Sequence, residues 1–180
     1  MARTKQVFSN DELPYVWLGR EQDTGKTPGG RMYFTGDTIF SYGSHFPIAR
    51  IRTAPNGEEV ILMPTRTYSK TTAKHIWAVE YALRRQPLQV VYCNDPSVVT
   101  SHDSNLKRFK NAMDTIAEKH AKARKPWLYS RGIFNEARMA REYCGVMCLP
   151  VPAWALLPEG IEPGAPVIAA MKMCQPVVER

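Results

Sequence analysis

Residues 46–63 read FPIARIRTAPNGEEVILM, and the Asn56-Gly57 pair near their centre is the strongest local signal in the chain. Asn-Gly tolerates positive φ at both central positions of a type I′ turn, the tight turn that joins two antiparallel strands. The pair therefore predicts a β-hairpin between residues 46–53 and residues 59–63. Because residues 60–63 are apolar at successive positions, we expect residues 59–63 to form a central strand with both faces covered.

The residues before this hairpin extend it into a meander. Met32–Phe34 and Thr38–Tyr42 are rich in β-branched and aromatic side chains, and Gly36-Asp37 between them marks a turn. The sequence therefore predicts three or four antiparallel strands. Residues 1–30 begin with polar residues and end in Pro28-Gly29-Gly30, and we expect them to form a flexible N-terminal segment.

After residue 64 the apolar positions recur at helical spacing. Ser and Thr side chains within residues 65–72 offer helix N-caps, and Pro87 limits the helix that follows. Residues 88–92 read as a further strand, a long helix runs from Asp103 or Ser104 to about residue 124, and a shorter helix covers residues 134–143. The apolar stripe predicted for the long helix is Leu106, Phe109, Met113, Ile116, Ala117 and His120.

These elements predict an α+β fold in which an antiparallel β-meander is packed by two or three helices. We expect the core domain to span residues 31–144. Residues 145–180 hold six of the 14 prolines among Val, Leu, Ala and Met side chains. This composition predicts an extended Pro-rich apolar tail, because prolines interrupt helices and the segment is too apolar for a simple linker.

Charge is the compositional feature that bears on function. The 180-residue chain has a formal net charge of +7. Residues 66–141 contain fifteen Lys or Arg and six Asp or Glu, so the excess of positive charge lies in the middle of the chain. A basic segment between near-neutral flanks indicates a polyanionic partner, of which nucleic acid is the commonest.

Composition also excludes several classes of protein. No stretch approaches the ~18 apolar residues of a transmembrane helix, so we expect no membrane partner. The polar N-terminus predicts no secretory signal, and four scattered cysteines are typical of reduced thiols, which favours a cytoplasmic location. Gly25-Lys26-Thr27 is spaced wrongly from Gly19 for a phosphate-binding loop, and neither a cofactor nor a metal site is predicted.

The start of the first predicted helix is the candidate phosphate site. Hydroxyls and free backbone N–H groups at a helix N-terminus bind anions, the neighbouring cations add charge, and Phe46 and Trp77 add rings for base stacking. The residues assigned to this site are Tyr42, His45, Arg66, Tyr68, Ser69, Lys70, Thr71, Thr72, Lys74 and His75. The alternative is that Ser69 only caps its helix and the aromatic side chains only fill the core.

The long helix is predicted to present a basic face to phosphates. Its cations fall mostly off the apolar stripe, so they are expected to give salt-dependent affinity with little base specificity. These residues are Lys107, Arg108, Lys110, Lys119 and Lys122.

Two segments carry a resemblance to a known family. They read GDTIFSYGSHFPIA over residues 36–49 and YSKTTAKH over residues 68–75. The pair resembles an uncharacterised family of small proteins from bacteriophages and mobile elements, with Phe40 where tyrosine is usual. The resemblance covers about residues 33–83 and implies a phage context, hence the bacterial host cytoplasm, but no activity.

We expect a binding protein rather than an enzyme, with single-stranded RNA favoured over DNA because aromatics accompany the cations and no helix-turn-helix is evident. One alternative is a metal-independent ribonuclease in which His45 and His75 act as acid and base and Lys70 or Arg66 stabilises the transition state. A second alternative is a protein-interaction role, as an inhibitor of host defence or an assembly component, with self-association or partner capture through the tail.

Overall fold

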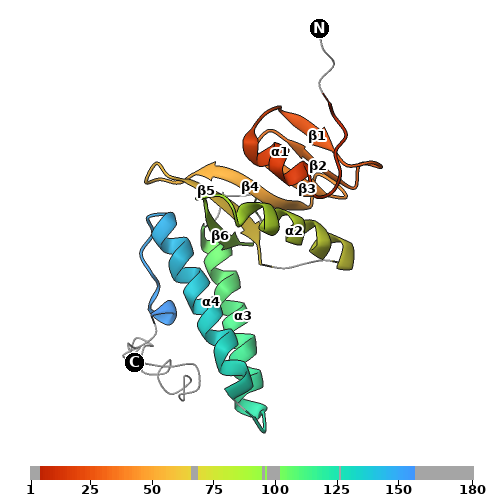
Figure 1. Ribbon diagram of the computed structural model, residues 1–180. Helices are drawn as coiled ribbons and strands as arrows, with labels where there is room; N and C mark the ends of the chain where they lie inside the picture. The colour runs from red at the N-terminus through yellow and green to blue at the C-terminus, as the bar shows by residue number, and fades with distance from the viewer. Residues whose placement is uncertain (1–4, 66–68, 95, 97–101, 126, 157–180) are drawn as a thin grey trace. The chain divides into compact units, whose positions relative to one another are not determined.

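The computed structural model describes residues 5–65, 69–94, 96, 102–125 and 127–156. The chain divides into two compact units, Met1–Thr100 and Ser101–Arg180, and each is described by itself. The sequence predicted one core domain over residues 31–144, and the division at Thr100 corrects this. The first unit carries the sheet and two helices, and the second carries a pair of long helices (Figure 1).

The first unit is built on a six-stranded sheet in which every strand lies beside its neighbour in the chain. Neighbouring strands from β1 to β5 are antiparallel, which confirms the predicted meander, whereas β6 is parallel to β5. A parallel pair needs a crossover connection, and helix α2 (Lys70–Leu83) supplies it. The strands are β1 (Thr24–Lys26), β2 (Met32–Thr35), β3 (Thr38–Ser41), β4 (Pro47–Thr53), β5 (Glu59–Pro64) and β6 (Gln89–Cys93).

The β4–β5 hairpin forms as predicted, but its turn is of a different type. The amide of Gly57 donates to the carbonyl of Ala54 at 2.9 Å. Among the residues of this turn, only Gly57 has a positive φ, at 87°. Pro55 explains the difference, because its φ near −65° suits the first central position of a type I turn. Gly57 then takes the left-handed position that closes a three-residue hairpin loop.

The prediction of a flexible segment over residues 1–30 is wrong for residues 5–30. Residues Leu13–Gly19 form helix α1, and Thr24–Lys26 form an edge strand of the sheet. Phe8, Leu13 and Trp17 belong to the buried hydrophobic cluster. The helix was missed because it has only 7 residues, too few for its apolar period to show in the sequence.

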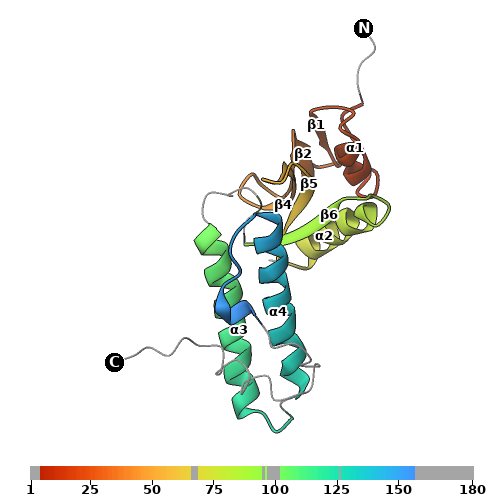
Figure 2. The same ribbon diagram turned by 90° about the vertical axis from the view of Figure 1, so that its left-hand side faces the viewer.

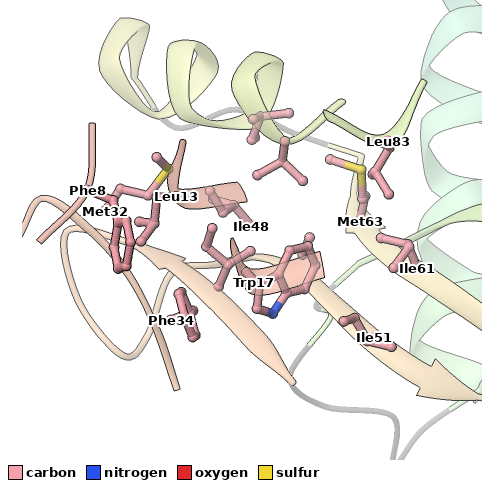
Figure 3. Packing of buried hydrophobic residues seen from close by; sticks show 14 residues of the cluster. Phe8, Leu13, Trp17, Met32, Phe34, Ile48, Ile51, Ile61, Met63 and Leu83 are labelled. Carbon is pink, nitrogen blue, oxygen red and sulfur yellow. The ribbon is translucent and has the colours of Figure 1, made fainter. Parts of the chain in front are cut away.

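The core of the first unit lies between the sheet and helices α1 and α2 (Figure 3). Trp17 is only 1% exposed and lies among Phe34, Ile48 and Ile51 of the sheet. From α2, the apolar residues Ile76, Val79 and Leu83, which recur at helical spacing, are buried. Burying this stripe fixes which face of α2 is exposed to solvent.

The second unit is a pair of helices, α3 (His102–Lys122) and α4 (Trp127–Val146), which lie side by side in both views (Figures 1 and 2). The predicted stripe of α3 packs against α4, with Phe109 and Met113 fully buried. α4 begins before the predicted start near residue 134, and α3 begins at His102, so Asp103 and Ser104 lie within its first turn rather than capping it.

The described part of the predicted tail packs on this helix pair. Ala153–Ala155 form a short 3-10 helix, and Arg141 of α4 donates to the carbonyl of Ala155 at 2.6 Å. Trp154 contacts the cluster formed by Met113 and its neighbours. Residues 157–180, on which the prediction of an extended tail and a tail partner mainly depends, lie outside the described residues.

Candidate nucleic-acid interface

The N-terminus of α2 is capped as the sequence indicated. The hydroxyl of Ser69 accepts from the amide of Thr72 at 3.1 Å, and Ala73 makes the first intrahelical bond to the Ser69 carbonyl. The hydroxyl of Thr72 is paired with that of Ser69 at 3.0 Å and is buried. The amides of Lys70 and Thr71 have no hydrogen-bond acceptor within the helix. Two N–H donors therefore lie at the helix N-terminus, where the helix dipole is positive. Arg66 and Tyr68, predicted for the same site, lie outside the described residues.

His75 has a structural environment. Its side chain is 5% exposed, and its Nδ1 shares a hydrogen bond of 2.8 Å with the hydroxyl of Ser41, which is fully buried on β3. Burial lowers the pKa of His75 below its ordinary value, and the nearby charge of Arg31 lowers it further. The neutral imidazole therefore ties α2 to the sheet, with the ring of Tyr42 at 5.9 Å from its own.

This burial predicts a pH-dependent stability. The unfolded chain binds a proton near pH 6.5, whereas the folded chain binds it only at lower pH, so the free energy of unfolding falls as the pH drops through 6.5. One proton contributes at most about 1.4 kcal/mol per pH unit. Urea denaturation at several pH values measures the slope. His75→Gln, which keeps a polar group beside Ser41 without titrating, should flatten it, and an unchanged slope would contradict this origin.

His45, the other predicted catalytic residue, is exposed, and its ring lies 4.2 Å from that of Phe46. A general acid or base must reach the atom that it protonates or deprotonates. His45 is accessible from solvent, whereas His75 is buried and bonded to Ser41. The observed geometry of His75 therefore gives no support to the ribonuclease alternative.

The exposed face of α2 combines cations and aromatic rings. Trp77 and Tyr81 are 54% and 43% exposed, and their rings stack with centroids 5.3 Å apart and planes 26° from parallel. The guanidinium of Arg84 lies 6.0 Å from the ring of Tyr81. We call this surface the α2 face, and its residues, all exposed, are Lys70, Lys74, Trp77, Tyr81, Arg84 and Arg85.

Tyr81, Arg84 and Arg85 were not assigned to the site from the sequence, although a signal for them was present. From Lys70 to Arg84 the residues of the α2 face recur at steps of four, three, four and three, the spacing of one side of a helix, and Arg85 directly follows Arg84. The α2 face carries no carboxylate. Glu80 is only part-exposed and accepts a hydrogen bond of 3.5 Å from the hydroxyl of Tyr92 on β6.

A cavity of about 290 Å³ adjoins the aromatic part of the α2 face. Trp77 and Tyr81 line one side, and Tyr15 of α1 and Asp11 line the other. Both helices belong to the first unit and contact one another. The stacked rings therefore border a recess rather than a flat surface.

The cations predicted on α3 are only partly available. Lys110 forms an ion pair with Asp114 at 2.7 Å, and Arg108 is half-buried. Lys107, Lys119 and Lys122 are exposed, and no ion pair involves them within the part of the chain that the structure describes. These residues belong to the second unit, whereas the phosphate site predicted at the start of α2 belongs to the first.

The end of the helix pair adds cations that the sequence analysis did not assign. No Asp or Glu occurs from residue 119 to residue 135. Arg124, Lys125 and Arg131 are exposed there, together with Leu128, which is 67% exposed. With Lys119 and Lys122, these three cations form a basic end that has no ion pair among the residues the structure describes.

A larger cavity in the first unit offers less to an anion. It measures about 590 Å³ and is lined by three arginines and three carboxylates. Arg50 is paired with Asp37 at 2.9 Å, and Arg20 is paired with Glu59. Because these charges largely cancel, the α2 face is the stronger candidate for a polyanion.

Two further features are absent from the described residues. These residues contain no group of three or more His, Cys, Asp or Glu side chains placed to hold a metal ion. Nor do they include a helix with the length and hydropathy needed to span a bilayer.

Comparison with known proteins gives no relative for this chain: no family model, curated protein or solved structure matches it.

Proposed function

We propose that the protein binds single-stranded nucleic acid, with RNA favoured over DNA, through the α2 face. The observation that carries the proposal is the stacked, half-exposed pair Trp77 and Tyr81, with the exposed cations Lys70 and Lys74 before it in the chain and Arg84 and Arg85 after it. Proteins that bind single strands combine these two components, since cations follow the phosphates and aromatic rings stack on unpaired bases.

The arrangement along α2 suits a strand that runs parallel to the helix. Lys70 and Lys74 lie at the N-terminal end, where the free amides and the helix dipole also favour phosphate. Arg84 and Arg85 lie at the other end, and the two rings lie between these pairs. A duplex hides its bases, so the rings contribute to affinity only when the bases are unpaired.

The basic end of the second unit fits the same proposal as a supplementary phosphate contact. Lys119, Lys122 and Arg124 would add salt-dependent affinity without reading bases. A cytoplasmic location and a phage context are compatible with RNA binding and stay predictions.

Removing two cations tests the proposal directly. We expect Lys70→Gln with Lys74→Gln to weaken binding of a labelled single-stranded RNA, because two phosphates lose their partners. The slope of log K against log salt should become shallower by about 1.4, at about 0.7 per phosphate. Fluorescence anisotropy at several salt concentrations measures both quantities, with duplex RNA and single-stranded DNA as competitors.

The matched control removes two exposed cations away from the α2 face, Lys26 and Arg52, by the same change to glutamine. This variant should keep the salt slope of the unsubstituted protein. Equal slopes for both double variants would show that binding depends on net charge and not on α2. An affinity that does not respond to salt would contradict nucleic-acid binding and favour the protein-interaction alternative.

A further inference from the structure

The cavity beside Trp77 and Tyr81 contains one group that phosphate binding does not explain, the carboxylate of Asp11. Asp11 is exposed, and it makes no hydrogen bond or ion pair within the described ranges of the chain. A carboxylate facing a surface of four cations would oppose the binding of phosphate. Its place beside two stacked rings indicates that it contacts a part of the ligand other than the phosphates.

The backbone around Asp11 is held in place by a capping box. The amide of Ser9 donates to the carboxylate of Glu12 at 3.0 Å, and the amide of Glu12 donates to the hydroxyl of Ser9 at 3.1 Å. The amide of Leu13 also donates to the carbonyl of Ser9 at 3.1 Å. These bonds enclose Asn10 and Asp11 in a closed turn, so Asp11 is positioned in advance at the edge of the cavity.

The chemistry of a carboxylate decides which base it favours. An ionised carboxylate only accepts hydrogen bonds, and it can accept two in parallel. Guanine presents two adjacent donors on its Watson–Crick edge, the N1–H and the N2 amino group. Adenine, cytosine and uracil each place at least one lone pair beside their donor, which the carboxylate repels.

We infer that this cavity binds an unpaired guanine, stacked against Trp77 or Tyr81 with its Watson–Crick edge on Asp11. The inference rests on the proposed function and names the base that the same site prefers. A positively charged ligand such as a quaternary ammonium would also suit rings and a carboxylate, but the four cations of the α2 face disfavour it.

The test uses the full chain and four fluorescein-labelled RNA heptamers, UUUGUUU, UUUAUUU, UUUCUUU and UUUUUUU, with affinity measured by anisotropy. The guanine heptamer should bind at least about tenfold more tightly than the others. This is the discrimination expected when one side chain makes two hydrogen bonds to a base. Asp11→Asn, which replaces one acceptor by a donor, should remove this preference, and UUUUUUU should bind at least as tightly as before because the change also removes a negative charge. Asp23→Asn changes an exposed carboxylate at the other cavity and should keep the preference.

Equal binding of all four heptamers by the unsubstituted protein, or a guanine preference that survives Asp11→Asn, would overturn the inference while the proposed function stands. No binding of any heptamer contradicts the proposed function itself. Displacement of the guanine heptamer by tetramethylammonium chloride, but not by sodium chloride at the same concentration, would identify a cation cage and also overturn the inference.

Discussion

Trp77→Ala is expected to weaken the binding of single-stranded RNA about 10- to 100-fold, because one base loses its stacking partner. The side chain is 54% exposed, so its removal leaves the packing of the first unit almost intact. Tyr81→Ala should act in the same direction. The double variant should lose less than the product of the two effects, because the rings stack on each other. Anisotropy titrations at one fixed salt concentration measure all three variants.

Two substitutions separate stacking from simple apolar contact. Trp77→Phe keeps an aromatic face and should retain most of the affinity, whereas Trp77→Leu keeps bulk without a π-system and should resemble the alanine variant. If Trp77→Ala binds RNA as tightly as the unsubstituted protein, the α2 face is not the binding surface.

Trp17→Ala is expected to have the largest effect on stability, lowering the free energy of unfolding by about 3–5 kcal/mol. Trp17 is 1% exposed and lies at the centre of the cluster between α1 and the sheet (Figure 3). Removing its ring would leave a cavity among Phe34, Ile48 and Ile51 that a packed sheet cannot close. Urea denaturation followed by far-ultraviolet circular dichroism measures the loss.

Trp17→Phe should cost much less, because most of the volume stays and the buried indole N–H has no hydrogen-bond partner to lose among the described residues. Trp77→Ala is the matched control, since it is the same chemical change at an exposed site and should stay within about 0.5 kcal/mol. A loss below about 1 kcal/mol for Trp17→Ala would contradict the assignment of residues 5–30 to the core.

Trp77 and His75 show how far the sequence leads to a candidate site. Trp77 was predicted as a stacking residue from its place beside Lys70 and Lys74, and the structure leaves it exposed. His75 was predicted as a functional residue from the same segment, and the structure buries it against Ser41. Both residues lie in the same segment, so its composition could not distinguish them. They differ only in the face of α2 on which they lie.

Local sequence patterns were sufficient to predict the meander, the N-cap at Ser69 and the apolar faces of α2 and α3. Each of these features depends on residues close together in the chain. The type I turn at Pro55 is equally local, but the predicted type I′ turn was wrong because Pro55 fixes a negative φ at the first central position.

Other features depend on partners far apart in the sequence, and here only the tertiary structure decided. Residues 13–19 become a core helix because the sheet offers Trp17 a place to pack, and a 7-residue helix has little stability without such packing. The recess that joins Asp11 and Tyr15 to Trp77 likewise exists only because α1 and α2 pack on one cluster. The sequence by itself determined which residues carry charge and rings, while packing determined which of them meet.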